Sequence, residues 1–515
     1  MASAQYADKG DGVRDVEIVV ETPWSYLVAN RDEEAVVEVV DSVTSWTHPD
    51  AGYSDLVKKG YWDGKTHLLT SKKLQFPSGL VSDVQKALER VGYSVAVHDQ
   101  RICPAHGLKV IPLYGIELRD YQTDAIETAL RKRCGIIKCP PGTGKTEIMV
   151  GIVKALNVYP VLWLTDRERL LHQSQKRFET RLQCGIGCIG EGEWDVQRIT
   201  IATVQSLCAR LRRKEDDPKR KEAVELLQHT QVVISDETHH ASNPNEWYKM
   251  LMSCPAPFRF GCSATPLDRD DGSNISLVGS IGELIYELSP EDAGELGVIE
   301  LPIVTMVKYK MDPKEESRIS RLKAMKYAWD SKKKRMSMVQ ADGWSTIYRE
   351  GITQNASRNR AVLELCKRCI AEKRPTLILV WARAHGWNIY NALKEYFQTE
   401  QHHSFIYGDS ITPQRQEAVK RFNDGIVKVL VASSILDEGV DIPKISAVII
   451  AAGGQSTIKN IQRVGRGMRK AEGKTDLVVY DFVDSCHTVL QRHSNKRRKD
   501  YAGHSLAEVK TEVLT

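Results

Sequence analysis

The sequence predicts an α/β protein in which a small α+β domain precedes two doubly wound parallel-sheet lobes. A chain of 515 residues is too long for one hydrophobic core, so several domains are expected. From about residue 115 onwards, short and uninterrupted apolar segments alternate with helical stretches. That rhythm is typical of strands buried on both faces of a parallel sheet. Before residue 115 the strand-like segments alternate apolar and polar residues, which favours a separate α+β unit.

The N-terminal domain is predicted over residues 1–110. Its segments show the two-residue period of strands or the 3.6-residue period of helices. Gly92 ends the second helix, because glycine readily adopts the left-handed conformation that follows a helix. The predicted order is strands at 16–29, a helix at 32–46, a hairpin strand at 60–70, a helix at 81–92 and a strand at 93–99.

The first lobe is predicted over residues 111–305. Each apolar segment has the length of a strand and is followed by a stretch with helical periodicity, so crossover helices are expected between parallel strands. The predicted strands are CGIIKC (134–139), VLWLT (161–165), ITIAT (199–203), QVVISD (231–236) and RFGCSAT (259–265).

The second lobe is predicted over residues 346–490 with the same rhythm. The charged stretch before it, at 306–345, contains KKKR and is predicted to be a basic linker or insertion. Residues 491–515, which contain KRRK, are predicted to be a basic tail. The predicted strands are TLILVWA (376–382), HSFIYG (403–408), VKVLVAS (427–433), ISAVIIAA (445–452) and DLVVYDF (476–482).

Composition narrows the class of protein without identifying it. The formal net charge of +5 permits a nucleic-acid partner but is too small to indicate one. No apolar segment approaches the roughly 20 residues that span a bilayer, and the first residues have no signal-peptide core, so a cytoplasmic protein without a membrane partner is expected. The eleven cysteines lack zinc-site spacing and are expected to be reduced thiols.

The segment CPPGTGKT (139–146) lies between a predicted strand and a predicted helix, which is the context of a P-loop. Glycines there let backbone N–H groups surround phosphate oxygens at the start of a helix. The segment therefore predicts an ATP site, although a glycine-rich turn without phosphate is the alternative. Lys145 would reach the β- and γ-phosphates and Thr146 would hold Mg²⁺. The remaining predicted loop contacts are Pro141, Gly142, Thr143 and Gly144.

An acidic pair follows another predicted strand, in SDETHH (235–240). Asp236 at the strand end suits a Mg²⁺ ligand, and Glu237 suits the group that orients and deprotonates the attacking water. An acidic pair alone is as often part of a surface loop. The P-loop upstream makes the catalytic interpretation the stronger one.

Two shorter segments fit around these motifs. In GCSATPLD (261–268), Ser263 and Thr265 are small hydroxyls suited to relaying a change at Asp236. In LRDYQ (118–122), Arg119 and Gln122 precede the P-loop and are predicted to lie beside the adenine. Either segment alone is more typical of ordinary loop sequence, and their order around the other motifs favours the functional interpretation.

In this order, GTGKT, DETH, SAT and QRVGRGMR resemble the motifs of superfamily 2 helicases, and the resemblance covers residues 115–490. It implies two RecA-like lobes with ATP and Mg²⁺ as cofactors. It also assigns His239, with Ser263 and Thr265, to coupling. Further similarity lies in TDRERLLHQ (165–173), ATVQSL (202–207), YGDS with Arg415, and SSILDEGVDIP (433–443), in which Gly439 and Asp441 are assigned to the ATP site.

The segment QRVGRGMRK (462–470) spaces three arginines three residues apart. On a helix they would share one side and repel, so a strongly anionic partner is expected, with a solvated basic helix as the alternative. The resemblance assigns Arg466 and Arg469 to fingers that reach the γ-phosphate from the second lobe. It assigns Gln462 and Arg463 to the contact between the lobes.

Nucleic-acid contacts are also implied by the resemblance. It places Arg167, Thr203, Gln205 and Ser433 along a strand-binding face that contacts phosphates without reading bases. Helix capping or packing is the alternative for each of them.

Residues 58–93 are similar to the small domain that precedes the motor in UvsW-type phage recombination helicases. Aromatic residues among lysines there predict a nucleic-acid surface that includes Lys59, Trp62 and Lys65. The alternative is that Trp62 is a core residue and the lysines are solvated.

These motifs together predict an ATP- and Mg²⁺-dependent DNA helicase or translocase. It would act on single-stranded and branched duplex DNA in unwinding, branch migration, fork regression or annealing. If the chain is encoded by a phage, its location would be the host cytoplasm. The alternatives are an RNA helicase, the motor of a restriction or repair complex, or a nucleic-acid-binding scaffold with an inactive ATPase. The sequence identifies no protein partner.

Overall fold

Two separate units make up the chain in the computed structural model. The first consists of Met1–Cys139 and Gly144–Glu287, and the second of Pro140–Thr143 and Leu288–Thr515. The structure describes residues 15–29, 33–49, 51–166, 168–242, 244–269, 271–323, 325–330, 335–340, 343–398, 402–407, 412–433, 442, 444–454, 468, 474, 476–503 and 508–514.

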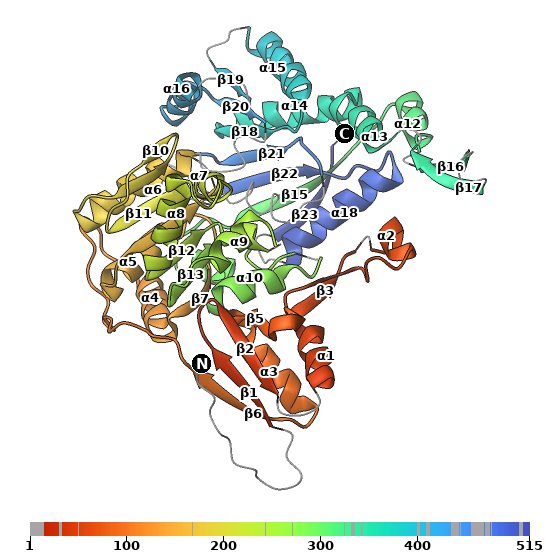
Figure 1. Ribbon diagram of the computed structural model, residues 1–515. Helices are drawn as coiled ribbons and strands as arrows, with labels where there is room; N and C mark the ends of the chain where they lie inside the picture. Colours follow the sequence, from red (N-terminus) through yellow and green to blue (C-terminus); the bar gives the residue numbers. More distant parts are fainter. Residues whose placement is uncertain are drawn as a thin grey trace, which may run out of the picture. The chain divides into compact units, whose positions relative to one another are not determined.

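The first unit begins with a four-stranded sheet in the order β5-β2-β1-β6 (Figure 1). Two amphipathic helices, α1 and α3, pack against each other and bury Val36, Val40, Val84 and Leu88. The strands are β1 (Asp15–Val20), β2 (Trp24–Ala29), β5 (Gln75–Pro77) and β6 (Ser94–Asp99). The other elements are α1 (Glu33–Thr44), β3 (Ser45–Thr47), α2 (Asp55–Lys58), β4 (Lys65–His67) and α3 (Val81–Arg90), with single 3₁₀ turns at Ala51–Tyr53, Ser71–Lys73 and Ser78–Leu80.

Lobe 1 follows in the same unit as an eight-stranded sheet in the order β10-β9-β11-β8-β12-β13-β7-β14. Its pairs are parallel except β9 with β10, and the central strands are buried, as their uninterrupted apolar sequence predicts. The strands are β7 (Cys134–Lys138), β8 (Val161–Thr165), β9 (Gly187–Gly190), β10 (Glu193–Trp194), β11 (Ile199–Thr203), β12 (Val232–Asp236), β13 (Phe258–Ser263) and β14 (Leu284–Glu287). The helices are α4 (Asp120–Lys132), α5 (Lys145–Leu156), α6 (Glu168–Leu182), α7 (Val204–Leu211), α8 (Pro218–His229), α9 (Glu246–Met252) and α10 (Asn274–Ile281), with a 3₁₀ turn at Thr238–Ala241.

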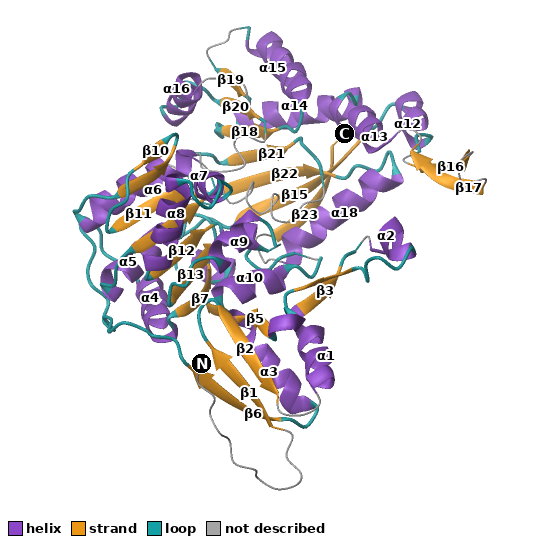
Figure 2. Ribbon diagram, viewed as in Figure 1, coloured by secondary structure: helices purple, strands orange, loops and turns teal. Residues whose placement is uncertain are grey.

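Lobe 2 forms most of the second unit and has a parallel sheet in the order β19-β20-β18-β21-β22-β15-β23 (Figure 2). Its strands are β15 (Pro302–Tyr309), β18 (Thr376–Leu379), β19 (His403–Ile406), β20 (Val429–Ala432), β21 (Ala447–Ile450), β22 (Leu477–Phe482) and β23 (Glu508–Leu514). The helices are α11 (Pro290–Glu295), α12 (Pro313–Ser320), α13 (Gly343–Tyr348), a π-helical turn (Arg349–Thr353), α14 (Ala356–Ala371), α15 (Arg383–Phe397), α16 (Thr412–Asn423) and α18 (Thr488–Gly503). A separate hairpin pairs β16 (Met325–Asp330) with β17 (Arg335–Gln340).

The structure differs from the predicted boundaries of lobe 2 in two places. Strand β15 starts before the predicted linker at 306–345 and pairs with β22. The first residues of the predicted linker therefore belong to the second sheet. The predicted basic tail, 491–515, contains most of α18 and all of β23 instead. Exposed charged residues on α18 conceal its buried side, and a prediction from composition therefore misassigns this helix.

The N-terminal domain and lobe 1 share one hydrophobic core. Residues of the small sheet cluster with Tyr248 and Met252 of α9 and with Val278 of α10. At Gly79 the backbone is so close to α10 that a Cβ would lie 1.9 Å from the carbonyl oxygen of Val278. We call this contact the docking face, consisting of Gly79 and Leu80 on the domain and Tyr248, Met252, Val278 and Gly279 on lobe 1.

Candidate nucleotide and nucleic-acid sites

Three neighbouring strands of lobe 1 end at one edge of the sheet and present the predicted ATP residues. Strand β7 leads into the P-loop, β12 ends at Asp236 and β13 ends at Ser263. The parallel register aligns Asp236 with Cys262, and Ser263 with Lys138. Ligands of open α/β sheets bind outside the carboxyl ends of the strands. The topology therefore brings the P-loop and the acidic pair to the same edge.

The P-loop has the backbone that phosphate binding requires. Gly142 and Gly144 have φ angles of +88° and +80°, which glycine adopts without strain. Lys145 is the first residue of α5 and Thr146 the second, so both stand at a helix N-terminus. The Nζ of Lys145 donates to the carbonyl oxygen of Cys139 at 3.3 Å. Thr143 is buried and donates to the carbonyl oxygen of Pro140 at 2.8 Å, and Pro141 follows in the same turn.

Gln122 lies against this loop. Its Oε1 accepts the backbone N–H of Arg119 at 3.0 Å, which directs its Nε2 the other way. A Cβ placed on Gly144 would lie 2.6 Å from that Nε2. Arg119 precedes α4 and donates to the hydroxyl of Tyr121 at 3.2 Å. The structure thus places Gln122 beside the P-loop, and the backbone of Arg119 is hydrogen-bonded to Gln122.

The acidic pair has an unusual backbone and electrostatics suited to a cation. Glu237 adopts a left-handed φ of +46° immediately after β12. Oδ1 of Asp236 accepts the N–H of Glu237 at 3.0 Å and the S–H of Cys262 at 3.4 Å. Burial and the neighbouring Glu237 raise the pKa of Asp236. Burial opposes ionisation of Glu237 as well, but hydrogen bonding to His239 and the charge of Lys145 outweigh it, and the pKa of Glu237 is lowered.

These residues fit Mg²⁺ and ATP. A partly buried carboxyl with a raised pKa, such as that of Asp236, becomes fully ionised when a divalent cation lies next to it. Thr146 and Asp236 are the residues that would hold the ion, and the glycines leave room for phosphate oxygens. The bound nucleotide and metal supply the reacting phosphoryl group and its charge neutralisation. The chain itself would contribute the carboxylate of Glu237 to orient the attacking water.

The predicted coupling residues gather around Glu237. His239 places Nδ1 at 3.1 Å from the hydroxyl of Ser263 and 3.4 Å from Oε2 of Glu237. The hydroxyl of Ser263 also accepts the N–H of Thr265 at 3.1 Å. Direct contacts therefore connect Glu237 with the turn after β13.

The structure adds residues that the sequence motifs did not single out. Asp166 accepts from Nε2 of Gln205 at 3.0 Å and lies 3.9 Å from Nε2 of His240. It thus connects a predicted nucleic-acid contact with the turn that carries the acidic pair. Asp166 lies within a segment that resembles a helicase motif, and this position was the one sequence feature that could have indicated a functional role. No sequence pattern indicated a role for Cys262, because its contact with Asp236 depends on the register of the two strands.

The predicted nucleic-acid residues of the lobes differ in accessibility. Thr203 is buried and caps α7 by accepting the N–H of Ser206 at 3.3 Å, so its hydroxyl serves the helix. Gln205 is exposed on the first turn of α7. Ser433 is buried at the end of β20, and its N–H donates to Ile406 at 3.0 Å. Only Gln205 of these three offers an accessible side chain.

Two aromatic residues, Tyr61 and Trp62, lie in the predicted aromatic–lysine surface of the N-terminal domain, and they differ in exposure. The indole of Trp62 donates to the carbonyl oxygen of Lys65 at 2.7 Å and lies edge-on to His48, so it builds a turn. Tyr61 is 79% exposed beside it. Lys59 and Lys65 are exposed on the same segment.

Seven predicted site residues lie outside the described residues. They are Arg167, Gly439, Asp441, Gln462, Arg463, Arg466 and Arg469.

All eleven cysteines are free thiols. No helix among the described residues is long and apolar enough to cross a membrane.

Comparison with known proteins gives two family matches. Residues 115–268 match the family described as type III restriction enzyme, res subunit. Residues 357–471 match the family described as helicase conserved C-terminal domain. The two matches fall on lobes 1 and 2.

Similar full-length proteins and a solved structure extend these matches. The chain is 28% identical to the DNA 3'-5' translocase XPB2 of Sulfurisphaera tokodaii, over 75% of this chain and 85% of the relative. It is 24% identical to the ATP-dependent DNA helicase uvsW of Enterobacteria phage T4, over 85% of each chain. The Saccharomyces cerevisiae Dbp5 structure with RNA and ADP BeF3 matches with a TM-score of 0.51 at 16% identity, covering 76% of this chain and 89% of that one. This last likeness supports the RecA-like fold of the lobes.

Proposed function

The chain belongs to superfamily 2 of the helicases, and we propose that it is an ATP-driven DNA motor that remodels branched DNA. The observation that carries the proposal is the convergence of Lys145, Asp236 and Glu237 at one edge of the lobe 1 sheet. A scaffold with an inactive ATPase would not require all three of these groups at the same edge of the sheet. Turnover of ATP is therefore the expected chemistry.

DNA is the favoured substrate because two curated relatives that cover most of the chain are a DNA translocase and a DNA helicase. The similarity to the phage helicase spans 85% of the chain, more than the two lobes at 115–490 provide, and so extends to other parts. Branched DNA is proposed because the N-terminal domain carries its own exposed aromatic and lysines, Tyr61, Lys59 and Lys65, apart from the motor.

The deciding experiment measures ATP hydrolysis with a panel of nucleic acids: single-stranded, duplex, forked and four-way DNA, and single-stranded and duplex RNA. We expect single-stranded and branched DNA to stimulate turnover and RNA to have little effect. Lys145→Ala should abolish turnover with every member, because no other P-loop amine reaches the phosphates. The matched control is Lys132→Ala, at an exposed position near the end of α4.

Stronger stimulation by RNA would instead identify an RNA helicase. No turnover with any member of the panel would identify the inactive scaffold.

A further inference from the structure

Helix α18 carries a basic run, KRRK at 496–499, that the ATP site does not use. The structure divides this run between two sides of the helix. Arg497 is buried in lobe 2, with 1% of its surface exposed. Arg498 and Lys499 are exposed, and Lys496 is half-buried on the outer side.

The inner side fixes how the helix is rotated about its axis. The guanidinium of Arg497 donates to Oδ2 of Asp481 at 2.8 Å and to Oδ2 of Asp484 at 3.3 Å. The hydroxyl of Tyr501 donates to Asp481 at 2.8 Å. Because these groups are buried and fully engaged, α18 presents one set of side chains outward. That surface is preorganised.

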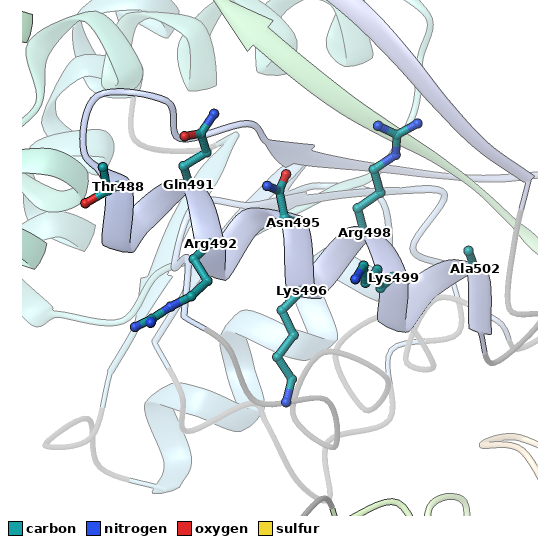
Figure 3. A pocket seen from close by; sticks show the side chains of 8 residues that line it. All are labelled: Thr488, Gln491, Arg492, Asn495, Lys496, Arg498, Lys499 and Ala502. Carbon is teal, nitrogen blue, oxygen red and sulfur yellow. The ribbon is translucent and has the colours of Figure 1, made fainter.

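The outer side lines a hollow of about 770 Å³ (Figure 3). Its side chains project from successive turns of α18, three or four residues apart, and so share one face. A second hollow of about 370 Å³ borders the helix and adds Lys308 of β15. The side chains used in the argument below are Gln491, Arg492, Asn495, Lys496, Arg498 and Lys499, which we call the α18 face.

The chemistry of the α18 face matches an anionic polymer. It offers four cationic groups with two amides, and no carboxylate or aromatic ring is among the described residues that line either hollow. Within the described part of the chain, Arg492, Arg498 and Lys499 have no ion-pair partner. Amides and cations suit phosphate oxygens, and the lack of an aromatic ring gives bases nothing to stack on.

We propose that the α18 face, together with Lys308, binds the phosphodiester backbone of DNA. The proposal rests on the proposed function and assigns lobe 2 a contact of its own with the substrate. From Thr488 to Ala502 the helix rises about 21 Å, which matches about six base-pair steps of duplex DNA. The α18 face is therefore long enough to contact several phosphates.

The test compares two triple variants of equal charge change. Arg492→Ala, Arg498→Ala and Lys499→Ala together remove three cations from the α18 face. Lys314→Ala, Arg321→Ala and Arg360→Ala remove three exposed cations from α12, the residue that follows it, and α14. Fluorescence anisotropy with labelled duplex and forked DNA is measured over a series of KCl concentrations. Thermal unfolding checks that both variants are folded.

We expect the α18 variant to bind DNA at least about tenfold more weakly at low salt. Its log–log salt dependence should be shallower by about 0.9 for each phosphate that the variant no longer neutralises. The control variant should resemble the wild type. If the triple variant does not fold, the single exposed changes Arg492→Gln and Lys499→Gln should each reduce the slope by about 0.9.

Equal affinity and equal slope in the α18 variant and the wild type would overturn the inference and leave the proposed function intact. An equal loss of affinity in the control variant would also overturn it, because the effect would then be one of net charge. A wild-type protein that does not bind DNA would remove the proposed function instead.

Discussion

Glu237 combines a left-handed backbone with contacts that keep its carboxylate ionised and in place. Its two neighbours differ: Asp236 is a partly buried acid suited to a cation, and His239 lies 3.4 Å from the carboxylate of Glu237. Two adjacent acids with opposite pKa shifts are typical of sites where each has a different task.

Glu237→Gln should retain nucleotide binding and lose hydrolysis. The amide keeps the size of the side chain but cannot accept a proton from water, so turnover should fall about 10²- to 10⁴-fold. Nucleotide affinity, measured with a fluorescent ATP analogue, should change only a few-fold. Glu225→Gln, on the exposed side of α8, is the control. A wild-type rate for the Glu237 variant would move the role of base to another residue.

Arg466 and Arg469 are predicted to act on the transition state. Arg466→Ala and Arg469→Ala should each bind ATP almost normally, because the P-loop supplies most ground-state contacts. Their kcat should fall about 10³- to 10⁵-fold if each is a finger. Steady-state kinetics separate the cases: a variant that only raises KM for ATP would show that the arginine binds substrate and is no finger.

At the scale of elements, the buried arginines of lobe 2 explain why α18 has a single orientation. Arg358 donates to Asp484 at 2.8 Å and to the carbonyl oxygen of Ala451 at 2.7 Å, and Arg497 of α18 donates to the same carboxylate of Asp484 at 3.3 Å. Some of the charged side chains of α18 are therefore part of the core of lobe 2.

Arg497→Leu should destabilise lobe 2 by about 3–5 kcal/mol, because it leaves the carboxylate of Asp481 buried without its cation. Urea unfolding followed by circular dichroism measures the change in stability. Arg498→Ala, the exposed neighbour, should be within about 0.5 kcal/mol of the wild type. Equal stability of the two variants would show that the buried pair contributes little.

His385 makes the stability of lobe 2 depend on pH. Burial, with the charge of Arg358, lowers the pKa of His385 to about 3, against about 6.5 in an unfolded chain. Between these values the unfolded state binds more protons, so stability is full above pH 6.5 and falls as the pH falls. The decrease approaches about 1.4 kcal/mol per pH unit.

Urea unfolding at pH 7 and pH 5 provides the measurement. His385→Gln keeps a donor for Oδ1 of Asn359, which lies 2.9 Å from Nε2, and should show a smaller decrease in stability between the two pH values. Some decrease should remain, because burial also lowers the pKa of His493 to about 4. An unchanged pH dependence in the variant would contradict the assignment.

The elements that could be predicted from the sequence are those whose burial is uniform. The central strands of both lobes are apolar along their whole length, and their predicted positions lie close to the observed ones. Elements with one buried side were harder to predict. The sequence of α18 resembles a basic tail, because the buried Arg497 and its exposed neighbours are all basic residues. The roles of single side chains were harder still to predict. The indole N–H of Trp62 is used in a turn, and the hydrogen bond responsible cannot be recognised from a pattern of residues.

At the scale of the whole molecule, the docking face makes the N-terminal domain part of lobe 1. The connecting residues reinforce this: Leu113 is buried, and Gly107 donates to the carbonyl oxygen of Leu156 at 3.1 Å. Deleting the domain would expose the apolar side chains of α9 and α10. A point change is therefore the cleaner test of the domain's contribution.

Gly79→Ala should loosen the domain from lobe 1. A Cβ there meets the backbone of α10, which cannot move aside as a flexible side chain can. We expect a lower thermal unfolding temperature and faster proteolysis at residues 100–118. Gly52→Ala is the matched control, because no atom lies within 4 Å of its added Cβ. Identical proteolysis of the two variants would show that the docking face tolerates a methyl group.

The docking face also sets a fixed length. If DNA is held both by the N-terminal domain and by lobe 1, the distance between the two contacts stays constant through every cycle of ATP hydrolysis, because one continuous core joins the two domains. The first unit would then set a fixed distance on the DNA. The N-terminal domain would bind a branch point only when it lies at that distance from the strand held by lobe 1. Advancing along DNA would then require the second unit to move while this distance stays fixed.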